Sequence, residues 1–100
     1  MFIKVDKRFV QVEFAKIKLL QAYGNYVKVY IDDQVFLTPR TLLSFEKLIS
    51  KDIFLQVHKS AIINRTLIDS IENDTINIGS IEVPIGRSYK SDLKKILNIT

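Results

Sequence analysis

Apolar and polar residues alternate in short runs along much of this sequence. Between residues 26 and 31, for example, Val27, Val29 and Ile31 alternate with Tyr and Lys side chains. Because successive side chains of a β-strand point to opposite faces, this pattern predicts strands with one buried face. Such runs, or short apolar runs between turn residues, occur at 3–5, 9–14, 26–31, 35–37, 54–57, 62–63, 68–71, 76–78 and 81–83. Their spacing of roughly 8 to 12 residues is typical of a β-rich domain.

Turn-forming residues separate the predicted strands, and two segments have helical periodicity instead. Hairpin turns are predicted at Asp32-Asp33, Asn73-Asp74 and Gly79-Ser80. Residues 41–49 carry apolar side chains at helical spacing, and either Thr38-Pro39 or Thr41 can begin the helix. Residues 88–97 place apolar side chains on one helical face and lysines on the other. At 100 residues the chain fits one domain covering residues 1–100.

The residues needed for several kinds of chemistry are missing from the sequence. It has no cysteine, one histidine and three glycines. Thiolate zinc sites, disulfides, Walker loops and GxGxxG loops are therefore excluded. His58 lies two residues from Ser60, but no nucleophile elbow or oxyanion loop accompanies the pair. We expect no enzymatic activity, no metal site and no cofactor.

The charge balance favours an anionic partner. The formal net charge is +4, with 15 Lys and Arg against 11 Asp and Glu. Residues 58–65 contain Lys59 and Arg65 and no acid, and residues 87–95 contain four basic residues and one acid. No apolar run reaches the length of a membrane span, and the lack of cysteine fits a reducing compartment. We therefore predict a cytoplasmic protein without membrane contact.

Three clusters supply the donors that nucleic-acid binding needs. They are Tyr23-Gly24-Asn25-Tyr26, then His58-Lys59-Ser60 with Asn64-Arg65, and then Gly86-Arg87-Ser88-Tyr89-Lys90. Each cluster also has a structural interpretation. Gly24-Asn25 forms a tight turn equally well, His58 is more often a half-buried scaffold residue, and Asn64 can cap a strand end. Arg87 is the hardest to assign to the scaffold, because it follows Pro84-Ile85-Gly86 at a strand-to-helix junction where an anion can bind.

The order of these motifs resembles the LytTR-type DNA-binding domain, the output module of many bacterial response regulators in two-component systems. The resemblance rests on QAYGNYVKVYI, on TLLSFEKLI, on FLQVHKSAIIN followed by Ile68, and on VPIGRSYKSDLKKIL. It implies a mainly β, or β-rich α+β, fold. Small antiparallel sheets would pack in a β-sandwich-like arrangement with one short helix and a C-terminal helix.

The resemblance also implies sequence-specific binding of double-stranded DNA by a transcription regulator, with loops rather than a recognition helix entering successive major grooves. Asn25, Lys59 and Arg87 would enter the groove. His58, Asn64, Arg65, Ser88 and Lys90 would hold the DNA backbone, and Tyr26 and Ser60 complete the expected DNA-binding set.

An alternative function stays open at this point. The predicted helix at 41–49 and the apolar strand edges suit a protein-interaction module that docks a receiver domain, a sensor or a second copy. Members of the family that the sequence resembles commonly occupy direct repeats, which implies a homodimer on DNA. No receiver domain precedes the module here, so the chain is expected to be either an excised output domain or a stand-alone regulator.

Overall fold

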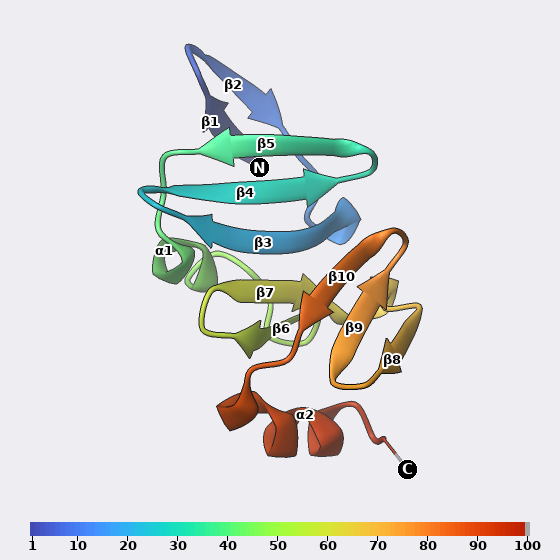
Figure 1. The fold of residues 1–100 in the computed structure, drawn as a ribbon. Coiled ribbons are helices and arrows are strands. Elements are labelled where there is room, and N and C mark those ends of the chain that lie inside the picture. The colour runs from blue at the N-terminus through green and yellow to red at the C-terminus, as the bar shows by residue number, and fades with distance from the viewer. Residues whose placement is uncertain (100) are drawn as a thin grey trace.

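The chain folds into three antiparallel β-sheets and two short α-helices along an elongated body of 45 × 23 × 21 Å (Figure 1). The computed structural model describes residues 1–99. The strands are β1 (Phe2–Val5), β2 (Arg8–Gln11), β3 (Ile17–Tyr23), β4 (Tyr26–Ile31), β5 (Gln34–Thr38), β6 (Phe54–His58), β7 (Ala61–Asn64), β8 (Ser70–Glu72), β9 (Thr75–Ile78) and β10 (Ile81–Pro84). The α-helices are α1 (Leu42–Glu46) and α2 (Lys90–Ile96), and the single-turn 3-10 helices are η1 (Phe14–Lys16), η2 (Arg65–Leu67) and η3 (Arg87–Tyr89).

A five-stranded sheet in the order β5-β4-β3-β7-β6 forms the centre of the molecule. Its middle strand, β3, was not among the strands predicted from the sequence. The register of β3 against β4 shifts between Ile17 and Leu19, so this strand contains an irregularity. Leu19 and Leu20 lie on opposite faces, as in any strand, and both are buried because both faces of this central strand are covered, so the alternation of apolar and polar residues is lost.

Two hydrophobic clusters cover the two faces of this sheet. One face packs with the β1-β2 hairpin and α1, and its cluster includes Leu20, Val29 and Phe45. The other face packs with the β10-β9-β8 sheet and α2, and its cluster includes Leu19 and Leu93. The fold is therefore mainly β, with small antiparallel sheets stacked on one another, as expected.

The helices are shorter than predicted. α1 ends at Glu46 although the apolar spacing continues to Ile49, and Leu48 is 45% exposed. Its start is as predicted, because the Thr41 hydroxyl accepts a hydrogen bond from the Ser44 N–H at 3.1 Å. The segment predicted as a helix at 88–97 divides into η3 and α2, and the leucine at its centre is buried in the second cluster.

Two of the predicted strands differ from the observed ones by more than one residue at an end. The strand predicted at 9–14 ends at Gln11, because the chain turns into the 3-10 helix η1 at Phe14. The strand predicted at 68–71 occurs as β8, which starts at Ser70. All three predicted hairpin turns are present, and four of their six residues have positive φ, namely Asp32, Asn73, Asp74 and Gly79.

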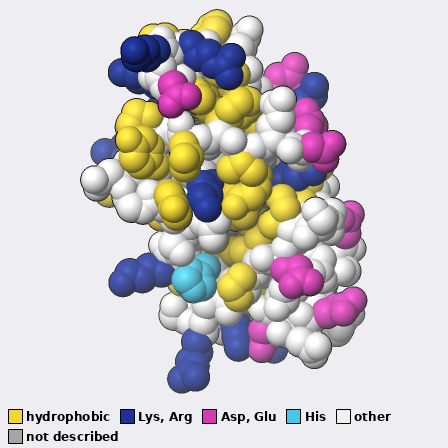
Figure 2. Space-filling model, turned by 45° about the horizontal axis from the view of Figure 1, so that its top comes forward, with side chains coloured by type: hydrophobic (Ala, Val, Ile, Leu, Met, Phe, Trp, Pro, Cys, Tyr) yellow, Lys and Arg dark blue, Asp and Glu magenta, His cyan; other side chains and the backbone are white. Residues whose placement is uncertain are grey.

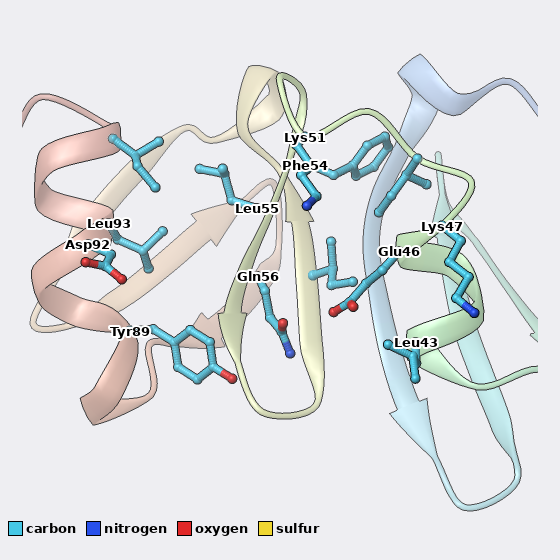
Figure 3. A pocket seen from close by; sticks show the side chains of 13 residues that line it. Leu43, Glu46, Lys47, Lys51, Phe54, Leu55, Gln56, Tyr89, Asp92 and Leu93 are labelled. Carbon is cyan, nitrogen blue, oxygen red and sulfur yellow. The ribbon is translucent and has the colours of Figure 1, made fainter.

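A groove lies between α1 and α2, and the edge strand β6 forms its floor (Figure 3). Its volume is about 660 Å³. In Figure 3, Leu43 and Glu46 project from α1, Leu55 and Gln56 from β6, and Asp92 and Leu93 from α2. The walls thus combine apolar side chains with two carboxylates, Glu46 and Asp92, and two lysines, Lys47 and Lys51, so the groove has no excess of positive charge to attract a nucleic-acid backbone.

Candidate nucleic-acid interface

The turns that carry two of the predicted clusters lie side by side at one edge of the central sheet, namely the edge where the strands end and not the side of an outer strand. β3 and β7 are antiparallel neighbours with Gln21 opposite Ala61, so the end of β3 meets the start of β7. The Ala22 N–H donates to the Ser60 carbonyl at 2.8 Å. The turn at 24–25 and the turn at 59–60 therefore project from the same edge, about 10 Å apart by two strand spacings.

The junction between β10 and α2 adds the third cluster to this edge. The Gly86 N–H donates to the Val57 carbonyl at 2.8 Å, which fixes the junction against the end of β6. A Cβ at Gly86 would lie 3.5 Å from the His58 Cα and 3.0 Å from the Tyr89 ring. Glycine permits this close approach. We call residues 24–25, 59–60 and 86–88 the tip row; they lie one below another at the left of Figure 1.

The tip row carries positive charge and no acid. Asn25, Lys59, Arg87 and Ser88 are all exposed. Among residues 1–99 neither Lys59 nor Arg87 takes part in an ion pair. In Figure 2 the histidine lies at the left with Lys and Arg side chains projecting beside it, while most Asp and Glu side chains gather at the right. Two cations and an amide are thus free to meet an anionic partner.

His58 has a fixed orientation behind the turn at 59–60. Its Nδ1 accepts a hydrogen bond from the Ser60 backbone N–H at 3.2 Å and lies 3.1 Å from the Ser60 Oγ. Because Nδ1 is the acceptor, the ring proton is assigned to Nε2, which is then a donor. The Gln56 side chain donates to the carbonyls of His58 and Lys59 at 3.3 and 3.4 Å and ties the turn to β6.

Asn64 is not part of this surface, which corrects the expectation that it holds the DNA backbone. Its side chain is fully buried at 0% exposure. The amide donates to the Ala15 carbonyl at 3.1 Å, and its oxygen accepts from the N–H and hydroxyl of Thr66 at 3.0 and 2.6 Å. Asn64 therefore has a structural role, but its side chain connects β7 to η1 and caps η2, whereas the structural interpretation expected a cap of the strand end.

Arg65 is also displaced from the tip row. It follows β7, which starts directly after the turn at 59–60, so five residues of extended chain separate Ser60 from Arg65 by about 16 Å. Its Nη2 donates to the Ile96 carbonyl at the last residue of α2 at 3.2 Å. The structure therefore gives Arg65 a role in holding the C-terminal helix, and the expected contact with the DNA backbone is corrected in the same way.

Lys90 lies next to the tip row but already has a partner. Its Nζ donates to the Asp74 carboxylate at 2.9 Å. Asp74 belongs to the turn between β8 and β9, and its carbonyl accepts from the Ile85 N–H at 2.9 Å. This contact was not predicted, since residues 74 and 90 are distant in sequence and no local pattern connects them.

Lys28 lies beside the tip row, although the sequence analysis did not select it as a DNA-binding residue. Its Nζ lies 4.1 Å from the centre of the Tyr23 ring, beside the turn at 24–25. Tyr23 and Tyr26 are 56% and 46% exposed, so they form a surface rather than a packing contact. Because Tyr26 and Lys28 are two residues apart on β4, the period of two would have placed them on one face.

Two other kinds of site are not found in the part of the chain that the structure describes. Within residues 1–99 no group of three or more His, Cys, Asp or Glu side chains is placed to hold a metal ion. None of the helices described has the length and apolar character needed to cross a membrane.

Comparisons with known proteins identify relatives over nearly the whole chain. A family model described as the LytTr DNA-binding domain matches residues 7–98. The chain is 29% identical to the sensory transduction protein LytT of Enterococcus faecalis over 98% of its own length, and 30% identical to LytT of Bacillus subtilis over 97%. It spans 43% of the length of each of these relatives. A solved LytTr DNA-binding domain from Bacillus cereus superposes with a TM-score of 0.85 at 27% identity, covering 99% of this chain and 96% of that one.

Proposed function

The chain belongs to the LytTr DNA-binding domain family, and on that premise we propose that it binds specific double-stranded DNA sequences as the output domain of a two-component transcription regulator. One observation carries the proposal. The loops of the tip row come from distant parts of the sequence and share one sheet edge, with Lys59 and Arg87 exposed and no acid among them. Binding through this edge would need no recognition helix.

We assign base contacts to Asn25, Lys59 and Arg87. Arg87 offers a planar pair of donors that matches the O6 and N7 acceptors of guanine. Asn25 offers one donor and one acceptor, which matches adenine. Lys59 suits either a guanine edge or a phosphate, because its ammonium group is a compact point charge.

We assign contacts with the DNA backbone to groups on the borders of the tip row. Ser60 and Ser88 provide hydroxyls, and the Nε2 of His58 is a donor that the scaffold leaves free. Tyr26 places an exposed ring and hydroxyl beside Asn25. These contacts would set the register of the domain on the duplex without reading its sequence.

The length of the tip row limits how it meets DNA. From the turn at 24–25 to the outer side of β6 it spans about 15–20 Å by strand spacing. A helical turn of DNA is ~34 Å long. Only the two ends of the row, with their side chains extended away from each other, would therefore approach successive major grooves. That arrangement stays a prediction, as do a homodimer on direct repeats, a receiver domain in a longer parent chain, and a cytoplasmic location.

Selection of bound duplexes from a random pool tests the proposal. The domain should enrich a motif, and its affinity for that motif should fall as salt rises, because cations at the interface displace counterions. The matched control is a variant in which Asn25, Lys59 and Arg87 are all alanine, which keeps the fold while removing the proposed base contacts. Failure of the parent to enrich any motif would reject the proposal.

A protein-interaction role is the second candidate, and the groove between α1 and α2 favours it. Leu43 on one wall is 63% exposed and Ile96 on the other is 45% exposed. An interaction module that docks a receiver or sensor domain through this groove would show no motif enrichment and little dependence on salt. The selection experiment therefore separates the two functions.

A further inference from the structure

The contact between Asp74 and Lys90 joins a scaffold turn to the border of the tip row. Register places Thr75 opposite Pro84, so Asp74 lies beside Ile85, one residue before Gly86. The side chains of Lys90 and Asp74 are 36% and 58% exposed, so water and other ions reach the pair. An exposed pair of this kind holds together weakly and exchanges partners readily.

The turn that carries Asp74 belongs to an acidic region. Between residues 66 and 86 the sequence has four acids, Asp69, Glu72, Asp74 and Glu82, and no Lys or Arg. Among the described residues, Asp74 is the acid of this group that forms an ion pair. Lys90 is thus held by Asp74, whose turn is hydrogen-bonded to Ile85 in the junction that precedes Arg87.

We propose that Asp74 limits DNA affinity by competing with a DNA phosphate for Lys90. This inference rests on the proposed function, because it assumes that the tip row meets a duplex. In the free domain the carboxylate occupies Lys90 at 2.9 Å. On DNA the ammonium group would exchange that carboxylate for a phosphate oxygen, and the free energy of breaking the pair would be lost from binding. Asp74 would then repel the same phosphate.

The backbone of Asp74 allows a clean test. Its φ is +60°, in the left-handed region where Asn is the best-tolerated residue after Gly. Its carbonyl, which accepts from Ile85, is unchanged by a side-chain substitution. Asp74→Asn therefore removes the charge and keeps the shape of the turn.

The experiment measures binding of the parent and of Asp74→Asn to a duplex selected by the parent, across a series of salt concentrations. Asp74→Asn should bind about two- to fivefold more tightly at low salt, the range expected for an exposed ion pair. The slope of log affinity against log salt should stay close to that of the parent, because Lys90 meets a phosphate in both complexes. Thermal unfolding of both proteins confirms that the fold is kept.

Two control variants separate competition for Lys90 from a general change of charge. Glu72→Gln removes one acid from the same sheet without freeing Lys90, and it should leave the affinity close to that of the parent. Asp74→Asn in a Lys90→Gln background should not tighten binding, since the group released is missing.

Each outcome decides a different claim. If the parent enriches no motif, the proposed function fails first, and the role of Asp74 fails with it. If the parent binds its motif but Asp74→Asn binds equally or more weakly, the competition is rejected while the proposed function stands. Equal tightening by Glu72→Gln, or tightening in the Lys90→Gln background, also rejects it.

Discussion

Arg87 concentrates the proposed specificity in one side chain. It stands at the start of η3, exposed, immediately after the glycine that brings the junction against β6. We expect Arg87→Ala to weaken binding to the selected duplex by ~1–3 kcal/mol and to relax the preference at one base pair. Fluorescence anisotropy titrations against the selected duplex and its single-base variants measure both effects.

Lys16→Ala is the matched control for Arg87→Ala. Lys16 precedes β3 and so lies at the opposite end of that strand from the turn at 24–25, where it pairs with Glu13 at 3.9 Å. Lys16→Ala removes one positive charge, as Arg87→Ala does. The two variants should therefore differ in affinity, and equal losses would mean that overall charge, and not a base contact, accounts for the role of Arg87.

For Asn64 we expect the opposite: its replacement should lower the stability of the fold and should not act through a DNA contact, because its side chain is buried. Replacement by Ala leaves the Ala15 carbonyl and the Thr66 N–H without their partner inside the protein. Each of these part-buried hydrogen bonds contributes ~0.5–1.5 kcal/mol. Urea denaturation should show a loss of that order for Asn64→Ala. Asn77→Ala, which removes an exposed hydrogen bond to Ser70, should lose less.

Asp74 gives a prediction that depends on pH. The hydrogen bond from Lys90, the charge of Lys90 and the charge of Lys94 hold the pKa of the Asp74 carboxyl below its ordinary value of 3.8. A lowered folded-state pKa means that the pair stabilises the fold above pH 3.8 and that this contribution is lost as pH falls through the folded pKa. Carbon NMR titration of the carboxyl should find this lower pKa, and Lys90→Gln should return it toward 3.8. A pKa unaffected by Lys90→Gln would show that the pair does not form in solution.

At the scale of elements, Gly86 couples the junction to the β6-β7 turn. A methyl group there would meet the Tyr89 ring at 3.0 Å and the His58 backbone at 3.5 Å. The distance to His58 is an ordinary contact, so we expect Gly86→Ala to displace the Tyr89 ring and with it η3, so that Arg87 no longer aligns with Lys59 and DNA affinity falls. Amide NMR shifts at residues 57–60 and 86–89 report the displacement. Gly24→Ala is the comparison: a methyl group at that position would have no atom within 4 Å, and its cost arises from the φ of +58°.

The elements that sequence analysis located well are those whose pattern is local. The hairpin turns at Asp32-Asp33 and Asn73-Asp74 were found because their residue types favour positive φ, which the structure shows at Asp32, Asn73 and Asp74. Strand β4 was found because its alternation is unbroken. β3 was missed because both of its faces are covered, so that Leu19 and Leu20 are apolar in succession.

The predicted site residues likewise fall into two groups, those that the structure places at the tips and those that it places elsewhere. Residue type and position at turns selected the clusters that contain Asn25, Lys59 and Arg87, the family resemblance singled out these three residues, and all three are exposed. Asn64 and Arg65 were selected because they follow Lys59 closely, but a strand of four residues carries them to the opposite sheet edge. The ion pair between Asp74 and Lys90 depends on how the three-stranded sheet meets α2, which no local pattern specifies.

The shape of the whole molecule determines how it would lie on a duplex. The central sheet stacks its strands along the long body, and the tip row follows that direction at one edge (Figure 1). A row of about 15–20 Å is shorter than one helical turn of ~34 Å. A single domain therefore touches one side of the duplex and does not wrap around it.

This geometry predicts the footprint of the domain on DNA. Hydroxyl-radical cleavage of the selected duplex should show protection on one face only, within about one helical turn for each bound domain. The Lys59→Ala variant should lose protection at the centre of that window and Arg87→Ala at one end, because Lys59 lies between Asn25 and Arg87 along the row. Two such windows in tandem, filled together, would indicate paired domains on direct repeats. Protection that encircles the duplex, or loss at the same nucleotides in both variants, would contradict a linear row of tips.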